Sequence, residues 1–593
     1  MDEKPKSIWK KPLRLPQLFL AWLGLMVVTT VILVIVMTII NTPLTKAHEV
    51  SGLFVFGAVS ATILLAGWIF IRWLCCWRNF KRFLFGLACF ATLIALFYAE
   101  EDWRGWHTWN SFKHEWEAKG EHFDYASIVP PAVPDDQNFA LTPLVASCYE
   151  MYFNKSGQEL RPRNTNVVDR MQFSVWADEN LAPWPTNGGN WQKATTNNLA
   201  EWQAYYRTLA GKTNLFPVAP APQSPGADVL LALGKFDPLI EELRTDSQLP
   251  CSRFPLTYTA ESPAAILLPH LAAMKRASQF LRLRILAELE AGQPEKALDD
   301  LKLSLRLVEA VRTDPFLISH LVRIAMLQIM LQPVYEGVAE HRWSDAQLVA
   351  LDAELAKLDF TRDYQLSMHG EIGGVDGEMN LIRRHPEYLP NYEDEFGNGF
   401  DDDKGGQYKE PSLPGKVFAR LIPTGWFYQN EYRYVRMMMD YYLPLADAGQ
   451  GTFSPALARQ RDAAVKAEFQ SFSPYNLLTR MMVSALNPSA KKFAHTQASV
   501  NLARTAIALE RYRLAHAELP ESLDALAPQF IAKVPHDVIG GQPLKYRREA
   551  NDQFVLYSVG WNETDDGGVV GFSSKGQSLD NSKGDWVWRY PAK

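Results

Sequence analysis

Six carboxylates lie close together in residues 391–403, and they are the densest group of chemically useful side chains in the sequence. The segment contains glycines, and a glycine-containing loop rich in carboxylate oxygens is a setting in which proteins hold Ca²⁺. Its spacing lacks the Asp/Asn alternation and the terminal Glu of an EF-hand. A solvated acidic loop is therefore the favoured interpretation, with a Ca²⁺ site as the alternative.

No sequence motif commits the chain to one reaction. His114 and Glu115 begin a zincin-like pattern, but a second His four residues later is missing. Neither a G-x-S-x-G turn nor a phosphate-binding P-loop occurs. His270 and His320 fall on apolar helical segments, where histidines are more often structural than ligating. The sequence therefore predicts no catalytic residue and no cofactor-binding residue.

Three uncharged apolar runs, residues 18–40, 51–71 and 83–99, decide where all these side chains lie. A helix rises about 1.5 Å per residue and the hydrocarbon core is about 30 Å thick, so roughly 20 residues span it. The first two runs have this length, and Lys81 and Arg82 beside the shorter third run can snorkel to the headgroups. We expect three transmembrane helices, the first of them retained and not cleaved as a signal peptide.

Basic residues predict the orientation, because Lys and Arg stay on the cytoplasmic side. Five precede the first run, one lies in the first loop and four lie in the second loop, whereas Glu100, Glu101 and Asp102 follow the third run. The N-terminus is therefore predicted to be cytoplasmic and the large C-terminal region extracytoplasmic. In a cell with two membranes this describes a multi-pass inner-membrane protein with a periplasmic C-terminal region.

Composition limits the partners of the outer region. The whole chain has a net charge of −6, and its first 99 residues carry ten basic but only three acidic side chains, so the remainder is strongly acidic. An acidic surface binds nucleic acid poorly. The expected partners are membrane lipid and periplasmic proteins. Of five cysteines only Cys148 and Cys251 lie outside the anchor, either bridged or as two buried thiols.

Helical signals dominate the middle of the chain. The third run is expected to continue outward as a helix until Gly120, with an aromatic stripe that packs. Gly292 is expected to end a helix in the left-handed conformation, and Ser344 with Gln347 forms a capping box that opens another. Between Glu371 and Gly406 the helices are expected to stop.

Three motifs carry a resemblance. Trp103-Arg104-Gly105, the Pro-rich run of residues 130–140 and Leu267-Leu268-Pro269-His270-Leu271 resemble a group of uncharacterised membrane-anchored proteins of Verrucomicrobia-like bacteria. The resemblance covers most of the chain after Glu100. It implies no activity.

The last hundred residues change pattern. A helix over residues 492–517 precedes three expected strands, at residues 543–547, 553–559 and 585–590. This order resembles the globular head of type II secretion pseudopilins. The residues that carry the resemblance are Tyr512, Leu519-Pro520, Ser522-Leu523, Leu526, Val534-Pro535, Asp537, Gly540, Pro543-Leu544, Tyr546, Phe554, Leu556-Tyr557-Ser558, Gly560 and Asp565-Asp566-Gly567-Gly568.

The pseudopilin resemblance implies a metal site. The final loop of those proteins binds Ca²⁺, which makes Asn562, Asp565 and Asp566 candidate ligands here, and their hard oxygen donors on one short turn suit Ca²⁺. The chain departs from the family in one respect. Its helix is internal and lacks a prepilin cleavage site, so the chain is not expected to be processed and polymerised as a pilin is.

The predicted fold is membrane-anchored and mainly α. It comprises a three-span anchor (1–99), a membrane-proximal helix with a Pro-rich region (100–226), an α-helical array (227–470) and a small α+β pseudopilin-like module (492–593). The predicted function is an extracytoplasmic interaction scaffold. The alternatives are a membrane-anchored hydrolase with unidentified carboxylates and an accessory component of a secretion or pilus-like system.

Overall fold

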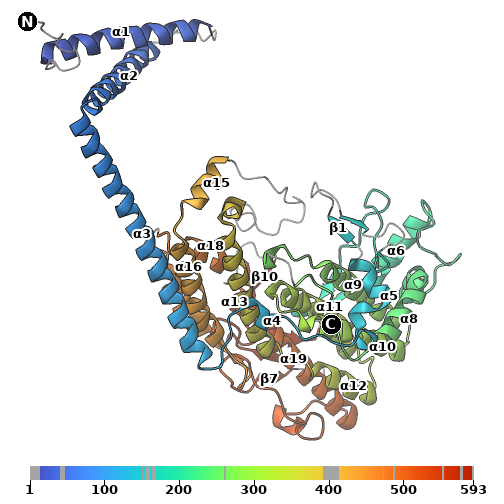
Figure 1. Cartoon of the computed structure of the whole chain (residues 1–593). Helices are drawn as coiled ribbons and strands as arrows, with labels where there is room; N and C mark the ends of the chain where they lie inside the picture. The colour runs from blue at the N-terminus through green and yellow to red at the C-terminus, as the bar shows by residue number, and fades with distance from the viewer. Residues whose placement is uncertain are drawn as a thin grey trace, which may run out of the picture. The chain divides into compact units, whose positions relative to one another are not determined.

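The computed structural model describes residues 14–39, 47–149, 151–153, 160–162, 169–258, 262–391, 413–471, 473–484, 486, 488–549, 553–573 and 578–590. Of the acidic segment 391–403 only Asn391 lies within these residues. The chain forms two compact units, Met1–Glu101 and Asp102–Lys593. Helices dominate it, as the sequence predicts (Figure 1).

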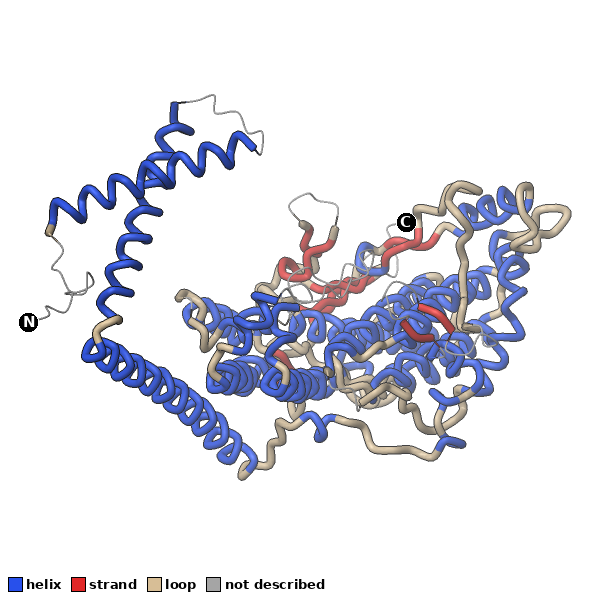
Figure 2. Tube along the Cα trace, turned by 45° about the horizontal axis from the view of Figure 1, so that its top comes forward, coloured by secondary structure: helices blue, strands red, loops and turns tan. Residues whose placement is uncertain are grey.

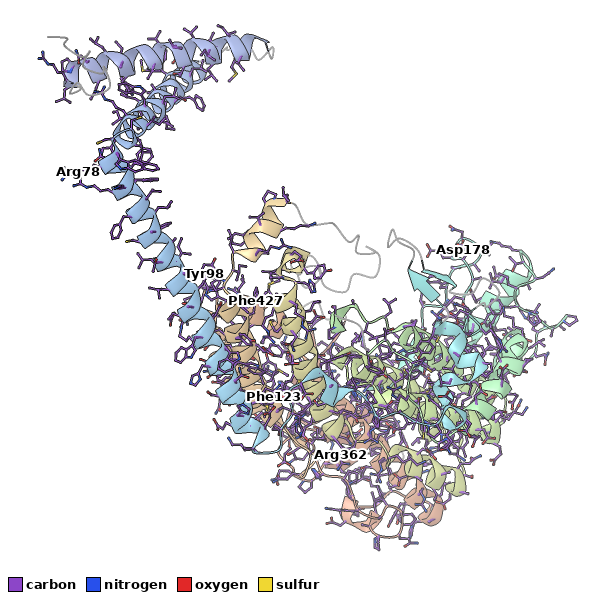
Figure 3. The ribbon with its side chains drawn as sticks, viewed as in Figure 1. Arg78, Tyr98, Phe123, Asp178, Arg362 and Phe427 are labelled. Carbon is purple, nitrogen blue, oxygen red and sulfur yellow. The ribbon has the colours of Figure 1, made fainter. Side chains whose placement is uncertain are left out.

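The first unit consists of helices with outward-facing apolar side chains (Figure 3). They are α1 (Leu15–Ile39), α2 (Ala47–Leu74) and the first part of α3 (Trp77–Glu117). Helix α1 packs closely on α2 at Gly57, where an added Cβ would lie 2.1 Å from the Thr30 hydroxyl. Thr29 Oγ1 also donates a hydrogen bond to the Gly57 carbonyl at 3.1 Å. Small residues and hydroxyls of this kind hold helices together in lipid.

Among the residues that the structure describes, four helices are long and apolar enough to cross a membrane: α1, α2, α3 and α11 (Leu317–Ala339). The first three, near the N-terminus, leave their apolar stretches almost wholly exposed, whereas 67% of the apolar window of α11 is buried inside the second unit. Core packing therefore accounts for the apolar character of α11. The exposed N-terminal helices fit a membrane protein.

The second unit is built mainly from helices. The shorter ones that come first are α4 (Tyr125–Ile128), α5 (Pro143–Ala146), α6 (Leu199–Ala210), α7 (Pro225–Leu233) and α8 (Asp237–Asp246). The longer ones that follow are α9 (Pro269–Glu290), α10 (Pro294–Ala310), α11, α12 (Asp345–Leu355) and α13 (Phe360–Arg384). The last are α15 (Leu413–Arg420), α16 (Thr424–Met437), α17 (Pro455–Glu468), α18 (Leu477–Ser484) and α19 (Ser489–His516).

One continuous hydrophobic core runs through this unit, and Phe123 and Phe427 are part of it (Figure 3). Two predicted helix boundaries are confirmed. Gly292 adopts a φ of +70° between α9 and α10, and Ser344 with Gln347 forms a complete capping box at the start of α12. Helix α3 also extends to Glu117, as predicted for the membrane-proximal helix.

The prediction that helices stop after Glu371 is wrong, because α13 continues to Arg384. Two glycines of this stretch of α13 serve close packing. A Cβ on Gly373 would lie 2.8 Å from the Ile128 side chain, and one on Gly377 would lie 2.6 Å from the Pro263 ring. Burial of the helix outweighs the low helix propensity of glycine.

Strands are few and short, and they lie among the helices (Figure 2). Two-stranded antiparallel pairs are β1 (Met151–Phe153) with β2 (Leu160–Pro162), β3 (Gly188–Asn190) with β4 (Thr195–Asn197), and β5 (Ala446–Asp447) with β6 (Thr452–Phe453). The C-terminal sheet has the order β11-β8-β7, from β7 (Lys545–Arg548), β8 (Phe554–Ser558) and β11 (Trp586–Arg589). These are the three strands that the sequence predicts.

A further hairpin, β9 (Val570–Phe572) with β10 (Leu579–Gly584), is not predicted from the sequence. Val570 packs against Val555, Tyr557 and Val587, which form a small cluster of their own. The other side of the sheet contributes Leu556 and Trp588 to the main core, where α19 contacts β8 and β11. All five residues of β8 are therefore buried.

Candidate functional site

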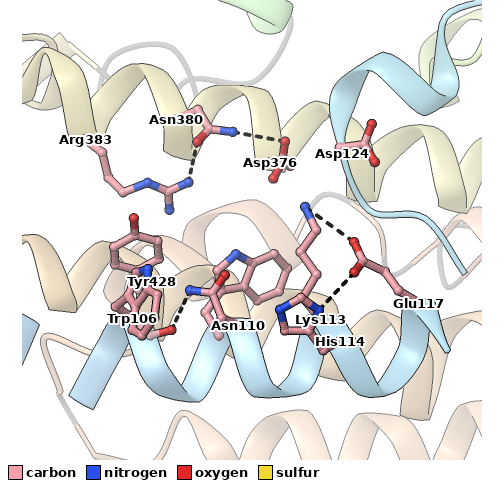
Figure 4. Close-up of a pocket in the computed structure, with 11 residues that line it drawn as sticks. Trp106, Asn110, Lys113, His114, Glu117, Asp124, Asp376, Asn380, Arg383 and Tyr428 are labelled. Atoms are coloured by element: carbon pink, nitrogen blue, oxygen red, sulfur yellow. Dashed lines mark hydrogen bonds and ion pairs between the residues drawn. The ribbon is translucent and has the colours of Figure 1, made fainter. Parts of the chain in front are cut away.

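A polar cavity of about 340 Å³ opens between three helices of the second unit. The outer part of α3 forms one wall, α13 the opposite wall, and α16 contributes Tyr428 (Figure 4). Asp124, which caps the short helix α4 by accepting the Ser127 amide at 3.1 Å, completes the lining. A volume of this size accommodates a small organic molecule.

Helix α13 presents Asp376, Asn380 and Arg383 to the cavity, because residues spaced by three and four share one helix face. Asp376 Oδ2 accepts hydrogen bonds from the Asn380 side chain at 3.0 Å and from the Tyr125 amide at 3.3 Å. Arg383 donates to Asn380 Oδ1 at 2.6 Å, and its guanidinium carbon lies 4.3 Å from the centre of the Tyr428 ring. The row is therefore held in place by its own hydrogen bonds.

Helix α3 supplies the facing row, where the expected aromatic stripe divides between core and cavity. Trp109 is buried in the core and Trp106 is half exposed, and both contribute to the lining of the cavity. Further along the helix, Lys113 Nζ and His114 Nδ1 lie 3.9 and 3.4 Å from the two oxygens of Glu117. Figure 4 shows this group opposite Asp376 and Asp124.

A second carboxyl group lies behind Asp376. Glu431 of α16 is completely buried and accepts a hydrogen bond from the Arg383 guanidinium. Burial raises the pKa of Glu431 to about 8, the Asp376 carboxylate beside it adds to the rise, and Arg383 opposes it. Within the described part of the chain, Glu431 Oε1 has no hydrogen-bond partner, which suits a protonated, uncharged carboxyl group at this buried position.

The cavity carries a negative balance. Its lining holds three carboxyl groups and two cationic side chains: Glu117, Asp124 and Asp376, with Lys113 and Arg383. The indole of Trp106 and the phenol ring of Tyr428 line the same space. Carboxylates combined with aromatic faces attract cationic ligands. A buried carboxyl group with a raised pKa, as Glu431 has, is also a group that enzymes use as an acid.

The predicted Ca²⁺ ligands are only partly brought together. Asn562 Nδ2 donates to Asp566 Oδ2 at 2.8 Å, so these two side chains meet. Asp565 instead accepts from the Tyr557 hydroxyl at 2.9 Å and lies 3.4 Å from Lys545 Nζ. The backbone amides of Asp566 and Gly568 donate to the buried carboxylate of Asp585.

The polar groups of this loop therefore find their hydrogen-bond partners within the protein. Within the described ranges, no group of three or more His, Cys, Asp or Glu side chains has the geometry to hold a metal ion. Asp585 also holds this turn, and the sequence did not suggest it, because it lies 19 residues away from Asp566. A Ca²⁺ site at Asn562, Asp565 and Asp566 stays a prediction.

Two other groups of residues, a Ser-Asp-His group and two cysteines, are of types that can be catalytic, but their surroundings are those of structural residues. Asp314 Oδ2 accepts from Ser319 Oγ at 3.0 Å and lies 2.7 Å from His270 Nε2, but all three side chains are fully buried and no hydrogen bond joins Ser319 to His270. This is not the order of a catalytic triad. Cys148 and Cys251 are free thiols, and burial raises the pKa of Cys148 to about 12.

Sequence reasoning missed the cavity for one physical reason. Asp376, Asn380 and Arg383 fall in the stretch where the helix was expected to end, so their common face was not considered. Their i, i+4, i+7 spacing is a usable signal once α13 is known to continue. Glu431, 55 residues further along the chain, is brought to Asp376 by packing alone.

No protein-family model, no curated protein and no solved structure matches the chain. The resemblances to the Verrucomicrobia-like membrane-anchored group and to pseudopilin heads therefore rest on the residues quoted for them.

Proposed function

We propose that the chain is a membrane-anchored interaction protein whose helical body binds a small organic cation. In this proposal α1, α2 and the apolar part of α3 span an inner membrane, with the N-terminus in the cytoplasm and the second unit in the periplasm. The observation that supports ligand binding is the cavity between α3, α13 and α16, in which carboxylates exceed cations and aromatic rings line the wall.

The experiment uses the full chain in lipid nanodiscs and calorimetric titration with choline, spermidine and arginine. We expect saturable binding of at least one of them, weakened about tenfold or more by Asp376→Asn. The neutral carbon analogue of choline, 3,3-dimethylbutanol, is the ligand control, and Asp440→Asn, an exposed carboxylate beyond α16, is the protein control. Absence of binding by every cation, or equal binding to the Asp376→Asn chain, would contradict the proposal.

A membrane-anchored hydrolase is the second candidate, and a specific observation favours it. Asp376 lines the cavity, and the buried Glu431 beside it has a pKa raised to about 8, so Glu431 can hold a proton at neutral pH. Turnover of a hydrolase substrate panel, abolished by both Asp376→Asn and Glu431→Gln, would support this alternative over simple binding.

A role with protein partners is also part of the proposal. The helix followed by an antiparallel sheet, α19 with β7, β8 and β11, has the element order of a pseudopilin head, which supports an accessory role in a secretion or pilus-like system by analogy alone. Co-purification from native membranes tests this role. Recovery of the chain without any secretion or pilus component would remove it.

A further inference from the structure

Helix α15 exposes an apolar face. Leu413, Val417 and Phe418 of the helix and Leu421 just beyond it are 53 to 76% exposed. At 100° per residue these positions fall within one arc of the helix, whereas the buried Ala419 lies on the opposite side. The helix contacts the short segment Pro386–Asn391, which follows α13.

Basic side chains border this face. Lys416 and Arg420 belong to the same two turns, and the guanidinium of Arg420 lies 3.7 Å from Glu387 while remaining largely exposed. A short helix with an apolar face and flanking Lys and Arg is the pattern of a segment that lies in a membrane interface. Anionic headgroups attract such side chains.

Helix α16, which follows α15, packs on α3 close to the end of the third apolar run. This contact indicates that the apolar face of α15 meets the membrane surface. Asp102 Oδ1 accepts the Gly425 amide at 2.7 Å, in the first turn of α16. A Cβ on Gly105 would lie 2.2 Å from the Gly425 carbonyl oxygen, so the two backbones touch. Asp102 is the third residue after Ala99, where the apolar run ends, which corresponds to about 4.5 Å of helix.

Chain length then limits the distance of α15 from the bilayer. Only Leu421, Ile422, Pro423 and Thr424 separate α15 from Gly425, a reach of at most about 18 Å when fully extended. The interfacial layer on each side of the hydrocarbon core is about 5 to 8 Å thick. Trp103, exposed on α3 next to Asp102, is a residue type that favours the same layer.

We infer that α15 docks its apolar face, Leu413, Val417, Phe418 and Leu421, into the extracytoplasmic surface of the bilayer that holds the N-terminal helices. The inference rests on the proposed membrane anchoring and is independent of the ligand of the cavity. Helix α16 follows α15 directly and contributes to the cavity wall. Lipid contact at α15 therefore holds that wall close to the membrane surface.

Depth-dependent fluorescence quenching tests this docking on the full chain in nanodiscs that contain anionic lipid. An environment-sensitive NBD probe is placed on a single cysteine at one of three positions, with the other cysteines replaced: Phe418→Cys, the native Cys89 within the apolar run, or Val349→Cys on the exposed face of α12. Lipids with a nitroxide near the headgroup should quench the Phe418 probe at least threefold more than the Val349 probe. The Cys89 probe should respond most to a nitroxide deep in the acyl chain.

A second variant separates docking from misfolding. Leu413→Glu with Val417→Glu, both at exposed positions, should reduce lipid quenching of the Phe418 probe to the Val349 level without changing the melting temperature. Equal quenching at Phe418 and Val349, or shielding of Phe418 from aqueous iodide without lipid quenching, would overturn the inference, the latter in favour of a protein contact. Unquenched Cys89 would overturn both the docking and the anchoring, whereas quenched Cys89 with unquenched Phe418 overturns the docking alone.

Discussion

Glu431 is an acid that its surroundings keep protonated at neutral pH. In the unfolded chain it ionises near pH 4.5, whereas its folded pKa is about 8, so between these values the folded state binds one proton more. Stability therefore falls as pH rises from about 4.5 to 8, by up to about 1.4 kcal/mol per pH unit. Glu431→Gln, which cannot ionise, should lose less stability over this range.

The measurement is the melting temperature of the full chain at pH 6 and pH 8. Wild type should lose a few degrees more than Glu431→Gln, because about 1 kcal/mol corresponds to roughly 2 °C in a large domain. Asp440→Asn should behave as wild type. An equal decline in wild type and Glu431→Gln would show that Glu431 does not carry the extra proton.

The predicted Ca²⁺ ligands give a separate test at the residue scale. If Asn562, Asp565 and Asp566 bind Ca²⁺ in the folded chain only, a hundredfold excess over the dissociation constant adds about 2.7 kcal/mol to the free energy of unfolding. The full chain should then melt higher in millimolar Ca²⁺ than in chelator. Asp565→Ala with Asp566→Ala should remove the difference. If the wild-type melting curves in Ca²⁺ and in chelator coincide, the loop is a hydrogen-bonded turn and not a Ca²⁺ site.

The range over which side chains meet explains which of them can be predicted. Asn562 and Asp566 are four residues apart, and their contact follows from a short turn. Asp376 and Glu431 belong to different helices, and neither periodicity nor composition indicates that α13 packs on α16 at these positions. The chemistry of the loop is therefore visible in the sequence, and that of the cavity is not.

Helix α13 offers two glycines one turn apart in opposite surroundings. A Cβ on Gly370 would lie 1.7 Å from the Pro315 carbonyl oxygen, whereas one on Gly374 meets nothing within 4 Å. Gly370→Ala should therefore lower stability by about 3 kcal/mol through backbone displacement. Gly374→Ala should be neutral or stabilising by up to about 1 kcal/mol, because alanine has the higher helix propensity.

Thermal unfolding of both variants checks this pair. Since Gly370 lies on the side of α13 that meets the chain entering α11, its loss should also weaken protection of α13 amides from hydrogen exchange. Equal melting temperatures for Gly370→Ala and Gly374→Ala would show that this close contact does not limit the position of α13.

The sequence predicts the end of a helix where residues next to that end determine it. The capping box at Ser344 and the left-handed Gly292 depend on neighbouring residues, and both are found. The continuation of α13 past Gly373 and Gly374 depends on partners such as Ile128 from far away in sequence. In the β9–β10 hairpin, β9 has only three residues and β10 is mostly polar, so neither strand shows the alternation that would predict it.

At the scale of the whole molecule, the long apolar N-terminal helices are the part that the sequence predicts best. Hydrophobic length is a property of each segment alone, and the exposed faces of α1, α2 and α3 agree with it. The packing of the second unit depends on contacts between distant segments, as where α19 contacts α11, α12 and α13. Its function depends on that packing.

The central claim is that three N-terminal helices hold the body and its cavity outside the cytoplasm. Reporter fusions after Trp77 and after Ala99 test it most directly, using one enzyme that is active only outside the cytoplasm and one that is active only inside. The account predicts cytoplasmic activity at Trp77 and extracytoplasmic activity at Ala99, because four basic residues lie between the second and third runs. Cytoplasmic activity of the Ala99 fusion would contradict it.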